Sequence, residues 1–383
     1  MPMRSSTAAV AEAFTRATGG RPGPSVVAIP WDVLTQKAEM QSVVAPPVAA
    51  PEADAGEVAR AAELLRSARN PMLMVGSGAR HAGTEILALA EKLQAPVVSL
   101  RGGRGIVSDE HPLGFTSAQG FERWAETDVL LGIGTRQELV WFRWPDTPEG
   151  LRTVNVDIDA AQQDRLTPDV PLTGDARAVT AQLLEALDDM PARASRSAEF
   201  EEVKEGVRDE IAQLQPHSDY LAAIRETLPR DGYFVEEVSQ IGFASIFALE
   251  VYEPRHFITS GYQGNLGYGF QTALGVQAAN RDSVVVSVTG DGGFLYGVQE
   301  LATAVQHLEE AGLAHVRGDG TIEVDRGAGM PRGEVGAVHG DDPEGLVGPV
   351  KLYARPWQLQ FAEGDQAHLQ GVVRSSYRTQ GRP

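Results

Sequence analysis

The sequence has 383 residues, of which 42% are hydrophobic, and its formal net charge at pH 7 is −19. No apolar run is long enough to span a bilayer, so the composition predicts a soluble globular protein without a membrane partner. The negative charge argues against nucleic acid as a partner, because the phosphate backbone would repel it. The absence of cysteine excludes disulfides and thiolate metal sites, and no signal-peptide pattern begins the chain, so we expect a cytoplasmic protein.

Residues 1–34 predict one helix and one strand, which is too little for a domain. The segment Ala9–Arg16 has the apolar spacing of an amphipathic helix, and Ser25–Ile29 (SVVAI) predicts a short buried strand. One helix and one strand cannot bury their apolar faces by themselves. We therefore interpret residues 1–34 as the remnant of a larger domain and residues 35–55, rich in proline and alanine, as a linker.

Residues 56–190 alternate between short apolar strands and amphipathic helices. Such alternation predicts a parallel sheet with helices on both faces, a Rossmann-like α/β domain. The predicted strands are Met72–Val75, Pro96–Leu100, Val129–Ile133 and Thr153–Val156, and the predicted helices include Glu57–Ala68, Thr84–Leu93 and Ala176–Leu187.

A second α/β domain is predicted at residues 216–307, after a linker and a polar helix at 191–215. It contains the predicted strands Tyr233–Val235 and Phe257–Ile258, followed by a glycine-rich loop, Gly261–Gly269. The loop opens a helix, Thr272–Ala279, and a β-branched run, Ser283–Thr289, comes next. The fold class is thus α/β, with a Rossmann-like parallel-sheet domain followed by a smaller, partial α/β domain.

The motif GDGG at Gly290–Gly293 stands where this last strand would turn into a helix. Such turns present free backbone N–H groups at the positive end of a helix dipole, which favours anions. Gly292 and Gly293 let the backbone approach an anion closely. Asp291 would repel a phosphate unless a cation lay between them, so the motif predicts a pyrophosphate bridged by Mg²⁺. The alternative is a Gly-Asp-Gly turn without function.

The segment GYQGNLGYGFQTALG (Gly261–Gly275), followed by VVVSVTGDGGFLYGVQELATAVQ, resembles the pyrophosphate-binding domain of thiamine diphosphate enzymes. The resemblance is strongest to acetolactate synthase large subunits and extends to benzoylformate and pyruvate decarboxylases. It implies that Asp291 is a Mg²⁺ ligand and that Leu266 holds the cofactor in its bent shape. The cofactor-binding residues that it implies are Gly264, Asn265, Leu266, Gly290, Asp291, Gly292 and Gly293.

The resemblance extends upstream to the central domain of that family, which binds FAD in some members. Gly76, Gly78, Gly134 and Arg136 are candidates to line an FAD pocket, although helix–strand packing explains the glycines equally well. Residues 1–34 resemble the last helix and strand of the family's pyrimidine-binding domain.

The sequence departs from the family in two places. The family's catalytic glutamate comes from the N-terminal domain of a partner subunit, and no residue here matches it, so we assign no catalytic residue. After His307 the family continues to an asparagine that completes the Mg²⁺ site, whereas residues 308–383 contain no asparagine and no clear period. We expect a divergent tail there, with disorder as one alternative for its structure.

We therefore expect a thiamine diphosphate- and Mg²⁺-binding 2-keto acid decarboxylase or carboligase of the acetolactate synthase type, in the form of an incomplete, poorly active fragment. The resemblance implies a partner as well, either a second copy of the chain or a complete homologue. The alternative is a non-catalytic FAD-binding or scaffold protein built on the central domain.

Overall fold

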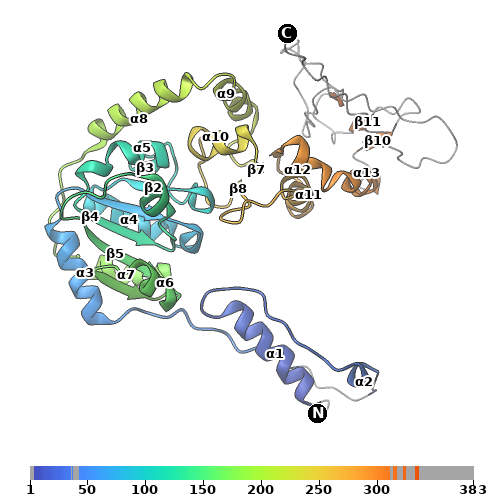
Figure 1. The fold of residues 1–383 in the computed structure, drawn as a ribbon, viewed down its shortest axis with the longest axis horizontal. Helices are drawn as coiled ribbons and strands as arrows, with labels where there is room; N and C mark the ends of the chain where they lie inside the picture. Colours follow the sequence, from blue (N-terminus) through green and yellow to red (C-terminus); the bar gives the residue numbers. More distant parts are fainter. Residues whose placement is uncertain are drawn as a thin grey trace, which may run out of the picture. The chain divides into compact units, whose positions relative to one another are not determined.

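The computed structural model of the protein describes residues 4–35, 37, 43–310, 314–316, 322–324 and 333–335. The fold is mixed α/β, as the sequence predicts (Figure 1). The chain divides into two compact units, Met1–Asp209 with Val251–Pro254, and Glu210–Glu250 with Arg255–Pro383. Among the described helices, none combines the length and the apolarity that crossing a bilayer requires.

The first unit is built on a six-stranded parallel sheet in the order β3-β2-β1-β4-β5-β6. This order runs outward in both directions from the β1–β4 pair, which is the doubly wound arrangement of Rossmann-like folds. Every residue of β1 and β4 is buried, because helices cover both faces of the sheet. The strands are β1 Pro71–Val75, β2 Val97–Ser99, β3 Gly114–Thr116, β4 Val129–Ile133, β5 Arg152–Asp157 and β6 Val170–Thr173.

Aspartate caps begin two of the helices that pack together in this unit, α3 (Ala55–Ser67) and α7 (Ala176–Ala186). The Asp54 carboxylate accepts from the backbone N–H groups of residues 56 and 57, and the Asp175 carboxylate accepts from those of residues 177 and 178. Each cap satisfies N–H groups that have no partner inside the helix. The other helices of the unit include α4 Gly83–Leu93, α5 Ser117–Glu122, α6 Ala160–Leu166 and α8 Ser197–Ala212.

Helix α8 is fastened to the first unit by an aromatic ring and an ammonium group. The ring of Phe200 is fully buried and meets the edge of the Phe115 ring, with 5.3 Å between ring centroids. Lys204, also buried, donates hydrogen bonds to the carbonyl oxygens of Asp109 (3.0 Å) and His111 (2.6 Å). The helix predicted to be polar thus has one face that belongs to the core.

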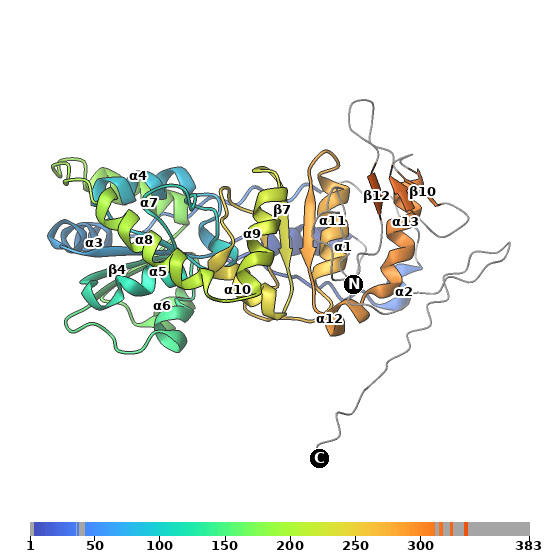
Figure 2. The same cartoon turned by 90° about the horizontal axis from the view of Figure 1, so that it is seen from above.

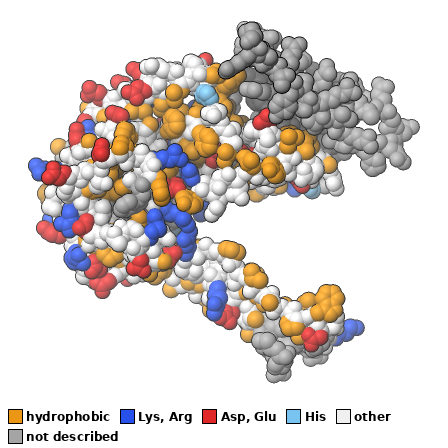
Figure 3. Space-filling model, viewed as in Figure 1, with side chains coloured by type: hydrophobic (Ala, Val, Ile, Leu, Met, Phe, Trp, Pro, Cys, Tyr) orange, Lys and Arg blue, Asp and Glu red, His pale blue; other side chains and the backbone are white. Residues whose placement is uncertain are grey.

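The N-terminal segment differs from its prediction. Helix α1 (Arg4–Thr18) is present, but residues 25–29 form no strand and the side chain of Val26 is 91% exposed. The prediction was wrong because a strand needs a neighbour to hydrogen-bond to, and none lies beside this segment in the described residues. Figure 3 shows apolar side chains on the surface of this segment; the large exposed ones are Val10, Phe14, Val26, Trp31 and Leu34.

The second unit contains a three-stranded parallel sheet in the order β8-β7-β9, with β7 Tyr233–Glu236, β8 Phe257–Ile258 and β9 Val285–Val288. Helix α11 packs on β7 and β9, and Figure 2 shows it beside them. The register pairs residue 236 with residue 288, so the carboxyl ends of β7 and β9 lie next to each other. The helices are α9 His217–Thr227, α10 Gln240–Ala248, α11 Gly269–Ala279, α12 Asp291–Leu295 and α13 Leu301–Glu310.

Within residues 308–383 the structure describes the end of α13 and three short strands. These are β10 Ala314–Val316, β11 Ile322–Val324 and β12 Gly333–Val335, paired antiparallel in chain order. The rest of the tail that we predicted to be divergent lies outside the described residues.

Candidate functional site

Two strand-to-helix turns lie against each other at the carboxyl end of the small sheet. Strand β7 leads through residues 237–239 into α10, and β9 leads through Thr289 and Gly290 into α12. A Cβ added at Gly290 would lie 3.4 Å from the carbonyl oxygen of Val238 and 3.7 Å from Cβ of Ser239. The motif Gly290–Gly293 therefore stands where a parallel strand gives way to a helix, as its sequence predicts.

The start of α10 adds a helix terminus to this place. Ser239 is its N-cap, and the serine Oγ accepts a hydrogen bond from the N–H of Gly242 at 3.0 Å. The remaining first-turn N–H groups of a helix have no partner within it and carry partial positive charge. Helices α10 and α12 thus begin side by side, which concentrates hydrogen-bond donors at the ends of two neighbouring strands.

The glycine-rich loop reaches the same turns. Gly264 has a left-handed backbone, with φ of +61°, and a Cβ there would lie 3.6 Å from Cγ2 of Val238. Asn265 is exposed, and the side chain of Leu266 is 50% exposed. The structure therefore brings Gly264 and Gly290 to the same short segment, Val238–Ser239, which the sequence analysis did not single out.

The two adjacent glycines of the motif have different surroundings. A Cβ at Gly292 would meet no described atom within 4 Å, so open space lies beside it. A Cβ at Gly293 would lie 2.2 Å from Oε1 of Glu237, well inside van der Waals contact. Gly292 leaves room for a ligand, whereas Gly293 is required by packing.

Asp291 is exposed, and its Oδ1 accepts a hydrogen bond from the N–H of Gly292 at 2.9 Å. No group of three or more His, Asp or Glu side chains that could hold a metal ion occurs in the part of the chain that the structure describes. Mg²⁺ does not need such a group, because it commonly binds one or two carboxylates and takes its other ligands from phosphate and water. The single carboxylate of Asp291 fits a metal that arrives with a diphosphate.

Glu237 is the residue of this site that the sequence analysis missed. Its side chain is fully buried, and its carboxylate accepts hydrogen bonds from the backbone N–H groups of residues 267–269 and from the Thr289 hydroxyl. The available signal was its place two residues after the predicted strand Tyr233–Val235, at the end of the strand where sites form in parallel sheets.

Comparison with known sequences identifies the family. The model of the thiamine pyrophosphate enzyme central domain matches residues 58–183, and that of the C-terminal TPP binding domain matches residues 237–311. Together these matches cover just over half of the chain and contain the site described above. The chain belongs to the thiamine pyrophosphate enzyme family.

Individual relatives carry several activities in their names. A probable 2-ketoarginine decarboxylase of Pseudomonas aeruginosa is 33% identical over 315 residues, with 78% of this chain and 55% of the relative covered. The acetolactate synthase isozyme 3 large subunit of Escherichia coli is 30% identical over 321 residues (77% and 56%), and a glyoxylate carboligase of Escherichia coli is 29% identical over 323 residues (77% and 54%). The chain spans about half the length of the curated relatives it matches.

In the central domain, the glycines that were candidates to line an FAD pocket pack against one another: Gly76 and Gly78 lie against the backbone of Gly134. A Cβ at Gly76 would lie 2.5 Å from the carbonyl oxygen of Gly134, and a Cβ at Gly78 would lie 2.9 Å from the Cα of Gly134. The carbonyl oxygen of Arg136 accepts a hydrogen bond from Arg165 at 2.7 Å. These contacts support the packing explanation of the glycines.

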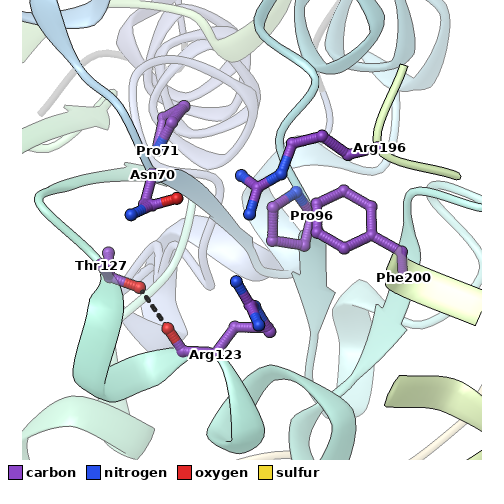
Figure 4. Close-up of a pocket in the computed structure, with 7 residues that line it drawn as sticks. All are labelled: Asn70, Pro71, Pro96, Arg123, Thr127, Arg196 and Phe200. Carbon is purple, nitrogen blue, oxygen red and sulfur yellow. Dashed lines mark hydrogen bonds between the residues drawn. The ribbon is translucent and has the colours of Figure 1, made fainter. Parts of the chain in front are cut away.

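A small hollow of the central domain lies where α8 meets the sheet (Figure 4). Arg123 and Arg196, two of the residues that line it, both bind Oε1 of Glu199, at 2.6 and 2.7 Å. The guanidinium of Arg196 also lies over the Phe200 ring, 4.7 Å from its centroid. Because these contacts use the charged groups to hold the helix, we assign the hollow a structural role.

Proposed function

We propose that this chain binds thiamine diphosphate with Mg²⁺ at the adjoining ends of β7 and β9 and takes part in the decarboxylation or carboligation of a 2-keto acid. The observation that carries the proposal is that Gly264 and Gly290 both lie close to the segment Val238–Ser239, since a Cβ added at either would stand within 3.7 Å of it. This proximity joins the glycine-rich loop and the GDGG turn into one site. Family membership supports thiamine diphosphate as its ligand.

The residues of the site fit a metal-bound diphosphate. The open space beside Gly292 lets phosphate oxygens approach the backbone, and the starts of α10 and α12 favour negative charge there. The exposed Asp291 carboxylate accepts a hydrogen bond from the N–H of Gly292, so it lies beside that residue, where Mg²⁺ would offset its repulsion of the phosphate. Gly264, Asn265, Gly290 and Gly293 frame the site.

Leu266 offers an apolar side chain, half exposed, on the loop that borders the site. We assign it the contact with the cofactor rings that the family resemblance implies. When bound, thiamine diphosphate would supply the nucleophilic carbon and the electron sink that the decarboxylation of a 2-keto acid needs. The task of this chain is to hold the diphosphate and orient the rings, and we assign no residue of it a catalytic role.

Titration calorimetry tests this proposal directly. We expect saturable binding of thiamine diphosphate in the presence of Mg²⁺, with the binding lost when EDTA is added or when thiamine replaces thiamine diphosphate. The variant Asp291→Asn should bind at least about tenfold more weakly, because it removes the charge that holds the metal. Asp282→Asn is the matched control, since this exposed aspartate precedes β9 at the opposite end of the strand. Equal heats with thiamine and thiamine diphosphate would disprove the diphosphate site.

The wider predictions concern partners and activity. Three statements stay predictions: that the partner is a second copy or a complete homologue, that the protein is cytoplasmic, and that the chain alone has little activity. Purified chain should consume pyruvate slowly or not at all, and turnover at the rates typical of the intact family would contradict the prediction of little activity. The alternative, an FAD-binding or scaffold protein, predicts visible flavin absorbance without affinity for thiamine diphosphate.

A further inference from the structure

Glu237 occupies an unusual position for an acidic residue. It is fully buried, and both of its carboxylate oxygens are hydrogen-bonded acceptors. Oε1 accepts from the N–H groups of Gly267 and Tyr268 (3.3 Å for the latter), and Oε2 accepts from the N–H of Gly269 (3.1 Å) and the Thr289 hydroxyl (2.6 Å). Four donors around one charge offset the cost of its burial.

These partners come from both cofactor-binding segments. Residues 267–269 end the glycine-rich loop and begin α11, while Thr289 immediately precedes the GDGG motif. On the same side, the carboxylate contacts the place where Gly293 lacks a side chain. One side chain, directly after β7, therefore contacts two segments that begin 30 and 52 residues further along the chain.

The contacts also decide which helix can meet a phosphate. The first N–H of α11, at Gly269, and the N–H of its N-cap Tyr268 donate to Glu237, so the charge that this helix terminus could stabilise is already supplied by the protein. The Glu237 carboxylate also lies against Gly293 in the first turn of α12, where a Cβ would stand 2.2 Å from its Oε1. The N–H groups at the start of α11 are therefore already used by the protein and do not offer donors to an external anion.

We propose that Glu237 is a positioning residue of the cofactor site, which holds the glycine-rich loop and the GDGG turn at the separation that a metal-bound diphosphate requires. This inference rests on the proposed function. Glu237 touches no reacting atom, because it is enclosed by protein groups. Its effect reaches the ligand through the backbone of Gly267–Gly269 and through Thr289.

The first test is Glu237→Gln. An amide cannot replace this carboxylate, since its NH₂ group would face backbone N–H donors in either orientation. We expect Mg²⁺–thiamine diphosphate to bind roughly tenfold more weakly or worse. Hydrogen exchange at residues 267–269 should become faster even without cofactor.

The matched control for lost stability is Tyr233→Phe, at the other end of β7. The Tyr233 hydroxyl donates to Oδ1 of Asn280 (3.1 Å), the residue that ends α11, so this variant weakens the same strand–helix contact away from the site. It should lower the melting temperature and leave cofactor affinity unchanged. For each variant, the loss of cofactor affinity is compared with the drop in melting temperature. If Glu237→Gln loses no more affinity for a given drop in melting temperature than Tyr233→Phe does, its role is structural and the inference fails.

A second pair keeps the test valid if Glu237→Gln fails to fold. Thr289→Val keeps the shape of the side chain and removes the hydroxyl donor, and we expect weaker cofactor binding with residues 267–269 still protected. Thr289→Ser restores the hydroxyl and should restore affinity to the wild-type value. Wild-type affinity in Thr289→Val, or no recovery in Thr289→Ser, overturns the inference.

The two proposals fail in different ways. If the wild-type chain does not bind the cofactor, the proposed function falls and the cofactor-directed role of Glu237 falls with it. If the wild-type chain binds but residues 267–269 exchange equally fast in wild type and Glu237→Gln, the proposed function stands and Glu237 does not position the loop.

Discussion

Adding one methyl group at Gly292 or at Gly293 should separate ligand binding from folding. Both residues belong to α12, and neither has a left-handed backbone, so alanine suits the conformation of each. At Gly292 the new Cβ would point into open space. At Gly293 it would lie 2.2 Å from Oε1 and 2.6 Å from Cδ of Glu237, a carboxylate held in place by backbone donors.

The contacts set the expected magnitudes. Gly292→Ala should leave the free energy of unfolding unchanged or raise it by about 0.5–1 kcal/mol, because alanine favours the helix. Its methyl group would occupy the space that we propose for the diphosphate, and losing one hydrogen bond to a charged group costs about 1.5–3 kcal/mol, or roughly 10- to 150-fold in affinity. Gly293→Ala should instead destabilise the protein by about 1–3 kcal/mol through overpacking.

Calorimetric titration with Mg²⁺–thiamine diphosphate and urea denaturation, applied to both variants, measure the two effects. The expected pattern is a stable, weakly binding Gly292→Ala and an unstable Gly293→Ala. Wild-type affinity in Gly292→Ala would show that the space beside it does not receive the diphosphate. Wild-type stability in Gly293→Ala would show that Glu237 moves freely and would refute the packing argument.

Three further predictions concern the first unit. Arg104→Met should cost about 3–5 kcal/mol in urea denaturation, because it leaves the buried Asp109 carboxylate without its ion pair, whereas Arg152→Met, at an exposed pair, should cost less than about 1 kcal/mol. Phe200→Ala should cost about 3–5 kcal/mol and expose the α8 segment to limited proteolysis. Burial raises the pKa of Asp157, so its stability contribution is greatest below the ordinary pKa of aspartate and falls as the pH rises through the raised value. Asp157→Asn should therefore stabilise the protein at pH 7, a gain that disappears below about pH 4 in thermal melts.

Local patterns predicted most of the regular structure. Strand β4 has the predicted bounds, since five consecutive apolar residues next to turn residues leave little freedom. Strand β3, only three residues long, was not predicted, because Gly114–Thr116 shows too short a pattern to distinguish from a loop. Helix α10 was also missed: Gln240–Ala248 is apolar over most of its surface and lacks the amphipathic spacing that marked the other helices.

The candidate site also has parts that the local sequence predicted and parts that it did not. The GDGG turn was predictable because a strand, an acidic residue between glycines and a helix follow one another within a few positions. The adjacent acidic pair Glu236 and Glu237 carries no such signal. Glu236, the last residue of β7, meets the Thr259 hydroxyl, whereas Glu237, just beyond the strand, meets the glycine-rich loop.

The sequence by itself determined which segments are strands or helices over most of the chain, and where the GDGG turn lies, because those properties depend on neighbouring residues. Only the tertiary structure decided which distant segments meet. The parallel pairing of β7 with β9 brings residues 237, 267–269 and 289 together, and the lack of a described neighbour leaves the apolar run 25–29 without a strand. A β-branched run favours a strand, but a strand also needs a neighbouring strand to hydrogen-bond to. The position of that neighbour depends on the whole fold.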